Sequence, residues 1–390
     1  MADAFLKKHE NSLLKCIYCG QCRYVCPMLT KDGWESTAPR GKMQLIYGWK
    51  KGEIPVDDRF IERIYQCSTC DRCTKECPSG VPVLEIIKDS RRELVKEKIG
   101  PYQPFKNADE NIVSVKNPIG KPIKERSFWR DLEGINKLDR QSAENLYFVG
   151  CMPSYWCTEI AGATFRVLEK SGEKFTILDG DEWCCGMLPF WDGNETLARR
   201  MVQRNIKQFY RRGVKKIITT CPGCYITFKH DYPKIFGNLD FKVLHAAEYF
   251  SQLFQAGKLN FTREMRTTVT YHDSCHLGRG EGIYDQPREL IKAVPGVKLV
   301  EMKKTRENAN CCGGPLTTAF PNLAIQLGLE RIQEALETGA EKLITSCPQC
   351  YIHLRKCSLE AGVKIEIFDL SSFIYEAMQK KKEAKEASFN

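Results

Sequence analysis

The sequence predicts an α+β protein of several domains, in which a helical N-terminal domain precedes two duplicated α/β modules. Two repeats and one change of periodicity lead to this prediction. A short cysteine motif occurs twice near the N-terminus, a longer cysteine pattern occurs twice in the rest of the chain, and strands alternate with amphipathic helices around the longer pattern. The 390 residues, 42% of them hydrophobic, are enough for two or three buried cores.

The N-terminal domain is organised around two copies of a four-cysteine motif. In each copy three cysteines stand two residues apart, a fourth follows after three more residues, and a proline comes next. Between the copies, apolar residues three and four positions apart predict helices over 38–52 and 56–66. The segment 39–42 (Pro-Arg-Gly-Lys) is expected to be a solvated turn. The motif cysteines are Cys16, Cys19, Cys22 and Cys26 in one copy, and Cys67, Cys70, Cys73 and Cys77 in the other.

The stretch 100–142 separates this domain from the modules. It is rich in proline and lysine and shows little periodicity, so we expect a linker. The second repeat begins after it and predicts the remaining boundaries. We place the helical domain at 1–99, the linker at 100–144, the two modules at 145–262 and 263–378, and a charged tail at 379–390.

Each module holds five cysteines: a single one, an adjacent pair followed by glycine, and a Cys-Pro-x-Cys motif. Corresponding cysteines are 124 to 127 residues apart. Strands precede the single cysteine and the Cys-Pro-x-Cys motif, and helices alternate with them. This order predicts an open parallel, Rossmann-like sheet with the cysteines at the strand ends, where such sheets bind ligands. The expected strands are 145–150, 173–179, 215–220 and 242–246 in the first module, and 267–274, 297–302, 342–346 and 364–368 in the second.

The composition indicates reduced, metal-binding cysteines. Twenty cysteines in a chain of this length do not indicate a small disulfide-stabilised secreted scaffold. The N-terminal segment lacks the apolar core of a signal peptide, and no apolar run reaches the length of a membrane span, so we expect a cytoplasmic protein. The net charge of +10 is divided evenly, +5 in residues 1–145 and +5 in the remainder, which argues against nucleic acid binding.

The short motif has the spacing of bacterial ferredoxins, in which the fourth cysteine ligates the other of two clusters. Zinc is the alternative, but a zinc site uses two cysteine pairs and leaves the third cysteine of the run without a role. The sequence therefore assigns one [4Fe–4S] cubane to Cys16, Cys19, Cys22 and Cys77, and a second to Cys67, Cys70, Cys73 and Cys26.

The adjacent cysteines of the modules can ligate different irons of one larger cluster. Both modules resemble the cysteine-rich CCG domain, and residues 10–375 resemble the D-type catalytic subunit of heterodisulfide reductase, in which a helical ferredoxin domain precedes two such modules. The resemblance implies one or two noncubane [4Fe–4S] clusters that split a disulfide in one-electron steps, with electrons delivered by the cubanes. The implied ligands are Cys151, Cys184, Cys185, Cys221 and Cys224 in the first module, and Cys275, Cys311, Cys312, Cys347 and Cys350 in the second.

Two histidines flank the first ligand of the second module. We expect His276 to be catalytic, as a proton donor to a leaving thiolate or as a hydrogen-bond donor to cluster sulfur, with a structural role in the turn as the alternative. For His272 the structural role is favoured. The first module has no histidine at the matching position, so we expect the second module to be the catalytic one.

Four further residues are expected to serve packing. Trp183 and Trp191 flank the first Cys-Cys pair and should shield a cluster from water. Cys157 and Cys357 fall outside both ligand sets and should lie in the core. The glycine motifs that bind dinucleotides or nucleotide phosphates are missing from the sequence, so we expect no FAD, NAD or ATP site.

These features predict an iron–sulfur oxidoreductase subunit that reduces a disulfide of thiol cofactors such as coenzyme M and coenzyme B. The alternative is an electron-relay subunit, as beside glycolate or lactate oxidases, electron-transferring flavoproteins and aromatic acyl-CoA reductases. The cysteine spacings argue against a non-redox zinc-binding or structural protein. Either redox function needs a partner, a flavoprotein or a membrane cytochrome b, in a hetero-oligomeric complex that is cytoplasmic or peripheral at the inner face of the membrane.

Overall fold

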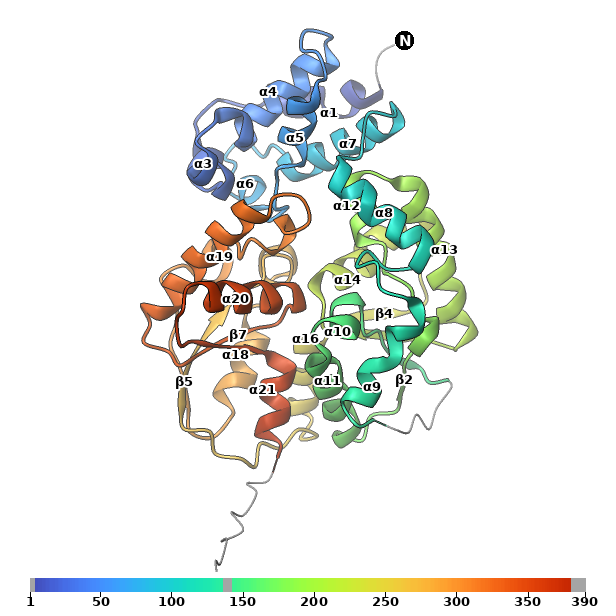
Figure 1. Ribbon diagram of the computed structural model, residues 1–390, viewed down its shortest axis with the longest axis vertical. Helices are drawn as coiled ribbons and strands as arrows, with labels where there is room; N and C mark the ends of the chain where they lie inside the picture. The colour runs from blue at the N-terminus through green and yellow to red at the C-terminus, as the bar shows by residue number, and fades with distance from the viewer. Residues whose placement is uncertain (1–3, 136–141, 380–390) are drawn as a thin grey trace, which may run out of the picture.

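The computed structural model describes residues 4–135 and 142–379. A helical N-terminal domain lies at one end of the molecule, and two sheet-containing modules lie side by side next to it (Figure 1). The predicted fold class is therefore confirmed. Within the described ranges, no helix is both long enough and apolar enough to cross a membrane.

The N-terminal domain packs its helices around one apolar core. Its helices are α1 (Ala4–Leu14), α2 (Gln21–Tyr24), α3 (Pro27–Asp32), α4 (Pro39–Lys50), α5 (Asp58–Tyr65), α6 (Arg72–Lys75) and α7 (Val83–Lys96). Ile46 of α4 and Ile64 of α5 are fully buried in the core. α4 begins at Pro39, whose fixed φ suits a first helical turn, and the Asp57 carboxylate caps α5 by accepting from the Phe60 amide at 2.7 Å. Both helices predicted between the motifs are present.

The stretch expected to be a linker is helical over much of its length. It contains α8 (Gln103–Val115) and α9 (Phe128–Leu132). α8 buries Phe105, Ala108 and Ile112, which are three and four residues apart, so its periodicity was hidden by the surrounding prolines and lysines. α9 packs against the first module, and α8 packs against both neighbours, with Phe105 in the N-terminal core and Ile112 in the core of the first module. Residues 136–141 of the expected linker lie outside the described residues.

The first module contains a four-stranded parallel sheet in the order β2-β1-β3-β4. In its register Leu146 pairs with Ile217, which pairs with Val243. Its elements are β1 (Asn145–Tyr147), α10 (Cys151–Tyr155), α11 (Thr158–Lys170), β2 (Phe175–Thr176), α12 (Met187–Asp192), α13 (Glu195–Arg211), β3 (Lys216–Thr219), α14 (Pro222–Ile226), α15 (Tyr232–Phe236), β4 (Lys242–His245) and α16 (Ala246–Gln255). The strands are shorter than predicted, and β2 has only two residues.

The second module repeats this topology with the order β6-β5-β7-β8. Thr270 pairs with Leu343, which pairs with Ile367. Its elements are β5 (Thr267–His272), α17 (Gly278–Glu281), α18 (Asp285–Lys292), β6 (Val297–Leu299), α19 (Pro321–Leu336), β7 (Lys342–Thr345), α20 (Pro348–Glu360), β8 (Glu366–Asp369) and α21 (Leu370–Ala377). In both modules adjacent parallel strands end at one edge of the sheet, and the cysteines follow there.

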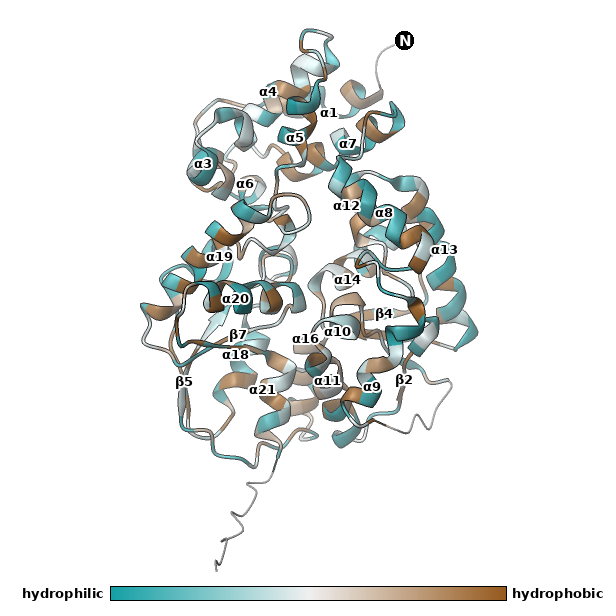
Figure 2. Ribbon diagram, in the orientation of Figure 1, coloured by the Kyte–Doolittle hydropathy of each residue, from teal (hydrophilic) through white to brown (hydrophobic). Residues whose placement is uncertain are grey.

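Apolar side chains hold the layers together. α13 is amphipathic, with both apolar and polar residues along its length (Figure 2), and its apolar face buries Leu197, Met201 and Phe209 against the first sheet. The two modules share a core as well, because α11 packs on α21 and α16 packs on α18. Phe250 and Phe373 are fully buried in this common core, so the two cysteine-bearing edges have a fixed mutual position.

Candidate metal centres

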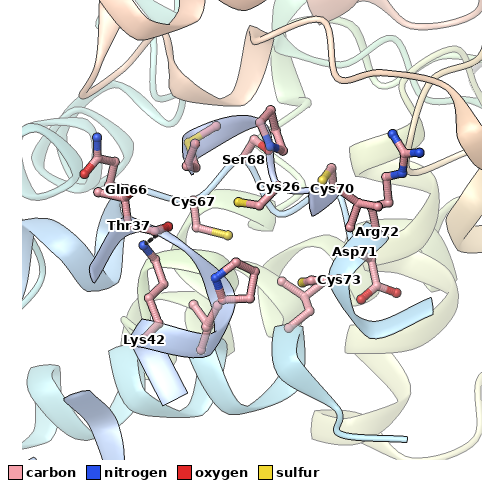
Figure 3. A pocket seen from close by; sticks show the side chains of 16 residues that line it. Cys26, Thr37, Lys42, Gln66, Cys67, Ser68, Cys70, Asp71, Arg72 and Cys73 are labelled. Atoms are coloured by element: carbon pink, nitrogen blue, oxygen red, sulfur yellow. Dashed lines mark hydrogen bonds between the residues drawn. The ribbon is translucent and has the colours of Figure 1, made fainter. Parts of the chain in front are cut away.

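Four cysteines line a cavity in the N-terminal domain that encloses about 420 Å³, part of it open to solvent (Figure 3). Cys67, Cys70 and Cys73 come from the second motif, and Cys26 comes from the end of the first. This is the crossed set that the sequence assigns to the second cubane. Four soft thiol donors converging on one cavity fit a [4Fe–4S] cluster.

The other crossed set lines a second cavity of about 290 Å³, which also opens to solvent. Cys16, Cys19 and Cys22 meet Cys77 there, and Cys19 is exposed. The Arg40 guanidinium also lines this cavity. The donor set fits a [4Fe–4S] cluster, and this one would lie nearer the molecular surface than the other.

The two motifs fold as the same loop. Tyr18 and Thr69, 51 residues apart, have φ values of 55° and 53°, and Gly20 and Asp71, also 51 residues apart, have φ values of 83° and 59°. Left-handed backbone at both positions curls the loop tightly. Each loop thereby brings the three cysteines of its run to the same cavity.

Lys42 is a fully buried cation beside the inner cavity. Its ammonium donates to the Thr37 carbonyl at 2.7 Å, as drawn in Figure 3, and burial lowers its pKa to about 8. The expectation of a solvated turn at 39–42 is wrong, because these residues form the buried first turn of α4. The packing is close: a Cβ on Gly41 would lie 2.1 Å from the Glu35 carbonyl oxygen.

The five cysteines of the first module converge at the edge of its sheet. Cys184 contacts both Cys151 and Cys185, and Cys224 contacts both Cys185 and Cys221. Hydrogen bonds from Cys184 and Cys224 lower the pKa of Cys185 to about 6. The thiolate, which is the form that binds metal, is therefore favoured at this position.

A buried arginine adjoins this site. Arg126 donates from Nη1 to the Cys151 sulfur at 3.3 Å and forms an ion pair with Glu182. Glu182 also accepts from the amides of Val149 at 2.9 Å and Gly150 at 2.8 Å. Burial alone would lower the pKa of Arg126, but Cys151 and Glu182 raise it well above its usual value, so the group is a permanent cation.

The five cysteines of the second module converge in the same way. The sulfurs of Cys312 and Cys350 are 3.2 Å apart, and Cys311 contacts Cys275 while Cys347 contacts Cys350. Backbone amides two residues beyond each member of the pair donate to its sulfur at 3.3 Å. Hydrogen bonds from Cys275 and Cys312 lower the pKa of Cys311 well below its usual value. Both donor sets fit a sulfur-ligated cluster.

His272 lies beside two of these thiols. A ring nitrogen of His272 and the sulfurs of Cys312 and Cys350 all lie within 4.8 Å of one another. Arg331 donates from Nε to His272 Nδ1 at 3.0 Å, and because arginine has no acceptor, the ring hydrogen is on Nε2. Burial lowers the pKa of His272 to about 3, so the ring is neutral.

His276 lies at a domain boundary. Its Nε2 donates to the Thr69 carbonyl at 3.1 Å, and its ring lies 4.6 Å from that of Trp191. Burial lowers its pKa to about 4. Its catalytic role stays a prediction. Trp191 and Trp183 both pack in the apolar cluster that contains the first Cys-Cys pair.

The inner cavity of the N-terminal domain adjoins the second module. The Ser68 side chain hydrogen-bonds Cys311, and burial together with the nearby charge of Cys311 raises the pKa of Cys70. Cys275 also lies within electrostatic range of Cys70. The structure thus places three cysteine sites in sequence, from the exposed cavity to the inner cavity to the second module.

The two cysteines outside the ligand sets are core residues, as predicted. Cys157 and Cys357 are fully buried in an apolar cluster. Cys157 of the first module packs in the same apolar cluster as Cys347 and Cys350 of the second, and Met152, which follows Cys151, packs against that cluster. The two five-cysteine sites therefore adjoin a common apolar region.

Sequence reasoning missed the cations of these sites. Arg126 stands in the expected linker, Arg331 stands inside a long amphipathic helix, and Lys42 stands in the expected turn. None belongs to a motif, and a buried basic residue cannot be distinguished from a surface one by periodicity. The only available signal was the position of Lys42 one turn into a helix that follows a cysteine motif.

Comparison with known proteins agrees with this architecture. A family model described as "Cysteine-rich domain" (CCG) matches residues 145–229 and 269–355, and one described as "4Fe-4S dicluster domain" matches residues 12–81. The D-type subunit of the dihydromethanophenazine:CoB–CoM heterodisulfide reductase of Methanosarcina barkeri is 34% identical over 388 residues, which cover 93% of each chain. The EtfAB:quinone oxidoreductase of Syntrophomonas wolfei is 32% identical over 82% of this chain and 47% of its own length.

A solved structure shows the same fold. The crystal structure of a hypothetical protein from Helicobacter pylori superposes with a TM-score of 0.60 over 88% of this chain and 68% of its own, at 14% sequence identity. The dicluster and CCG matches imply iron–sulfur clusters in this chain. The chain belongs to the D-type heterodisulfide reductase family, and it is an iron–sulfur oxidoreductase subunit of that family.

Proposed function

We propose that this subunit accepts electrons at the exposed cavity of the N-terminal domain, passes them through the inner cavity, and reduces a disulfide at the five-cysteine sites. The crossed cysteine sets would hold two [4Fe–4S] cubanes, and the five-cysteine sets would hold two noncubane clusters. Iron–sulfur clusters supply one-electron transfer over a wide range of potentials. The CoB–CoM disulfide named for the Methanosarcina barkeri relative is the proposed substrate class.

The observation that carries this proposal is the pair of complete five-cysteine sites facing one region. Reduction of a disulfide consumes two electrons and two protons and releases two thiols, so it requires two electron deliveries and room for two sulfur products. Cys157 packs with Cys347 and Cys350 in one apolar cluster, and Met152, next to Cys151 of the other site, packs against the same cluster. A relay of single electrons would need neither the second site nor this mutual placement.

The protein's own residues keep these sites anionic and dry. Apolar side chains bury both cysteine pairs, and Cys185 and Cys311 have lowered pKa values, so each site begins with a thiolate available to iron. Arg126 and Arg331 place buried guanidinium groups beside the two sites. These cations would offset the negative charge of a sulfur-ligated cluster.

The electron source has to be another protein. We propose a flavoprotein or a membrane cytochrome b as the partner, docked so that its redox group reaches the exposed cavity near Cys19. The second candidate function is an electron relay without disulfide chemistry. The similarity to the EtfAB:quinone oxidoreductase favours it, since that protein is named for transfer between a flavoprotein and a quinone.

Electron paramagnetic resonance distinguishes the two functions. The full chain, purified anaerobically and oxidised, is titrated with coenzyme M, coenzyme B and an unrelated small thiol. Disulfide chemistry predicts a new paramagnetic signal that appears only with the cofactor thiols and broadens when the iron is ⁵⁷Fe. Indifference to every thiol, with signals appearing only on reduction, would contradict disulfide chemistry and support the relay. A Cys347→Ser variant serves as the matched control, since it alters one five-cysteine site and neither cubane set.

A further inference from the structure

We propose that Arg279 is a positioning residue that locks the inner cubane site onto the second five-cysteine site and favours the reduced state of that cubane. The inference rests on the proposed occupancy of both sites by iron–sulfur clusters. It assigns the second module, and not the first, as the one that receives electrons from the N-terminal domain.

The guanidinium of Arg279 joins three cysteine-bearing segments. The residue is 6% exposed and lies one turn beyond Cys275 on α17. Its Nη1 donates to the Cys70 carbonyl at 2.6 Å, and its Nη2 donates to the Ala309 carbonyl at 2.7 Å. Its Nε and Nη2 both donate to the Glu307 carbonyl, at 3.0 and 2.9 Å. The loop of the inner cavity, the turn after Cys275 and the segment before Cys311 therefore share one side chain.

Two other contacts join the loop around Cys70 to the second module. His276, on the same turn, donates to the Thr69 carbonyl, and Arg72 donates to the Asn310 side chain at 3.2 Å. Thr69 and Arg72 flank Cys70, and Asn310 immediately precedes Cys311. The second module thus meets the N-terminal domain through its cysteine-bearing loops.

The first module meets the N-terminal domain differently. Its contact runs through α12, where Arg91 donates to the Trp191 carbonyl at 3.0 Å and Tyr65 donates to the Asp192 carbonyl at 2.6 Å. The carbonyls of this contact belong to a helix that lies beyond the Cys-Cys pair of the first module. Among residues 4–135 and 142–379, the hydrogen bonds that the inner cavity's cysteine loop makes to a cysteine-bearing loop of a module all go to the second module.

Charge supports the same assignment. Within the described ranges, Arg279 forms no ion pair with a carboxylate, and its side chain bonds only backbone carbonyls. A buried cation without a counterion is costly, so an anion is expected close by. The sulfurs of Cys70 and Cys275 both lie within electrostatic range of Arg279. Because a cluster gains negative charge on reduction, this cation stabilises its reduced form.

The test uses the full chain purified anaerobically, with Arg279 changed to Met, Gln or Lys. A redox titration followed by electron paramagnetic resonance measures the reduced fraction of the inner cubane. Loss of the charge in Arg279→Met and Arg279→Gln should lower the reduced-to-oxidised ratio at a fixed potential about tenfold, which is about 59 mV for one electron. Arg279→Lys keeps the charge, and its ratio should stay within about threefold of the wild type.

A second measurement, independent of the potential, reports how close the inner cubane lies to the cluster of the second module. Two paramagnetic clusters held close together broaden each other's signals, so the doubly reduced wild type should show this interaction. A lysine has one donor nitrogen and cannot span three carbonyls, so Arg279→Lys should weaken the interaction while keeping the potential. Arg126→Met is the matched control: it removes a buried arginine beside the first module and should leave the inner cubane's potential unchanged.

The outcomes separate this inference from the proposed function. A wild-type chain that lacks cubane signals overturns the proposed function. A wild type with its clusters but no interaction between them, or an Arg279→Met chain with unshifted potential and full interaction, overturns this inference alone. Should Arg279→Met lose the inner cluster, Arg279→Gln, which keeps a donor and most of the volume, decides the question by the same titration.

Discussion

Replacement of Arg126 tests whether the first five-cysteine site depends on a residue outside its module. Arg126 and Glu182 form an ion pair in which each side chain is 1% exposed. In Arg126→Met the Glu182 carboxylate stays buried without its cation. Breaking such a pair costs about 3–5 kcal/mol. The amides of Val149 and Gly150 still bind the carboxylate, so the lower end, about 3 kcal/mol, is expected.

Hydrogen exchange followed by mass spectrometry measures this loss locally, which suits a chain of several domains that has no single unfolding free energy. A loss of about 3 kcal/mol predicts roughly hundredfold faster exchange in peptides of β1 and α10, and little change in β5 and β7. Adding Glu182→Gln to Arg126→Met removes the unpaired charge and should restore about 2 kcal/mol of the lost local stability. Arg266→Met, on an 84% exposed side chain, is the control. Less than threefold faster exchange in Arg126→Met, or no recovery in the double variant, would show that the ion pair does not stabilise the first site.

Further predictions concern single residues. Gly313→Ala should lower the iron content of the second site, because Gly313 has a φ of 89° and a Cβ would lie 2.3 Å from the Ala324 carbonyl oxygen. Gly186→Ala has a similar φ of 86° but a wider separation, 3.1 Å from the new Cβ to Met201 Cβ, so it should lose less iron. Cys157→Ala should keep full iron content while costing on the order of 1 kcal/mol in local stability by hydrogen exchange, and loss of iron would make Cys157 a ligand. Burial raises the pKa of Asp369 to about 7. The folded chain then holds a proton that the unfolded chain loses near pH 4, so the contribution of Asp369 to stability should fall as pH rises from about 4 to 7. Asp369→Asn should flatten the pH dependence of hydrogen-exchange protection in peptides of β8 and α21 over this range, and an unchanged slope would contradict the raised pKa of Asp369.

The sequence predicted the fold because its signals were repetitive and local. Two repeats of cysteine spacing marked the domains, and alternating strands and helices marked the parallel sheets that the structure shows. The crossed grouping of Cys26 with the second motif and Cys77 with the first followed from the ferredoxin spacing, and the cavities contain these same groups. Strand lengths were overestimated, because apolar residues continue beyond the hydrogen-bonded ladder into the turns.

The features that the sequence did not reveal depend on long-range packing. Arg126 donates to Cys151 from a helical segment that was expected to be a linker, because the segment is rich in proline and lysine. Arg279 bonds residues more than 200 positions away, and no local pattern reports such a contact. Lys42 was expected in solvent because lysine usually is exposed, yet its ammonium donates to the Thr37 carbonyl in the turn before α4. Whether such a cation is buried, and which groups it contacts, depends on contacts between segments that are far apart in the sequence.

Disulfide reduction at the five-cysteine sites is tested by mixing the fully reduced chain with the heterodisulfide of coenzyme M and coenzyme B under anaerobic conditions. The thiols released and the electrons lost from the protein are counted in the same sample. The chain should be reoxidised with two thiols formed for every two electrons lost, and a chain carrying Cys221→Ser and Cys347→Ser should not react. A reduced wild-type chain that does not react with the disulfide but is reoxidised by a quinone analogue would exclude disulfide reduction and identify an electron relay.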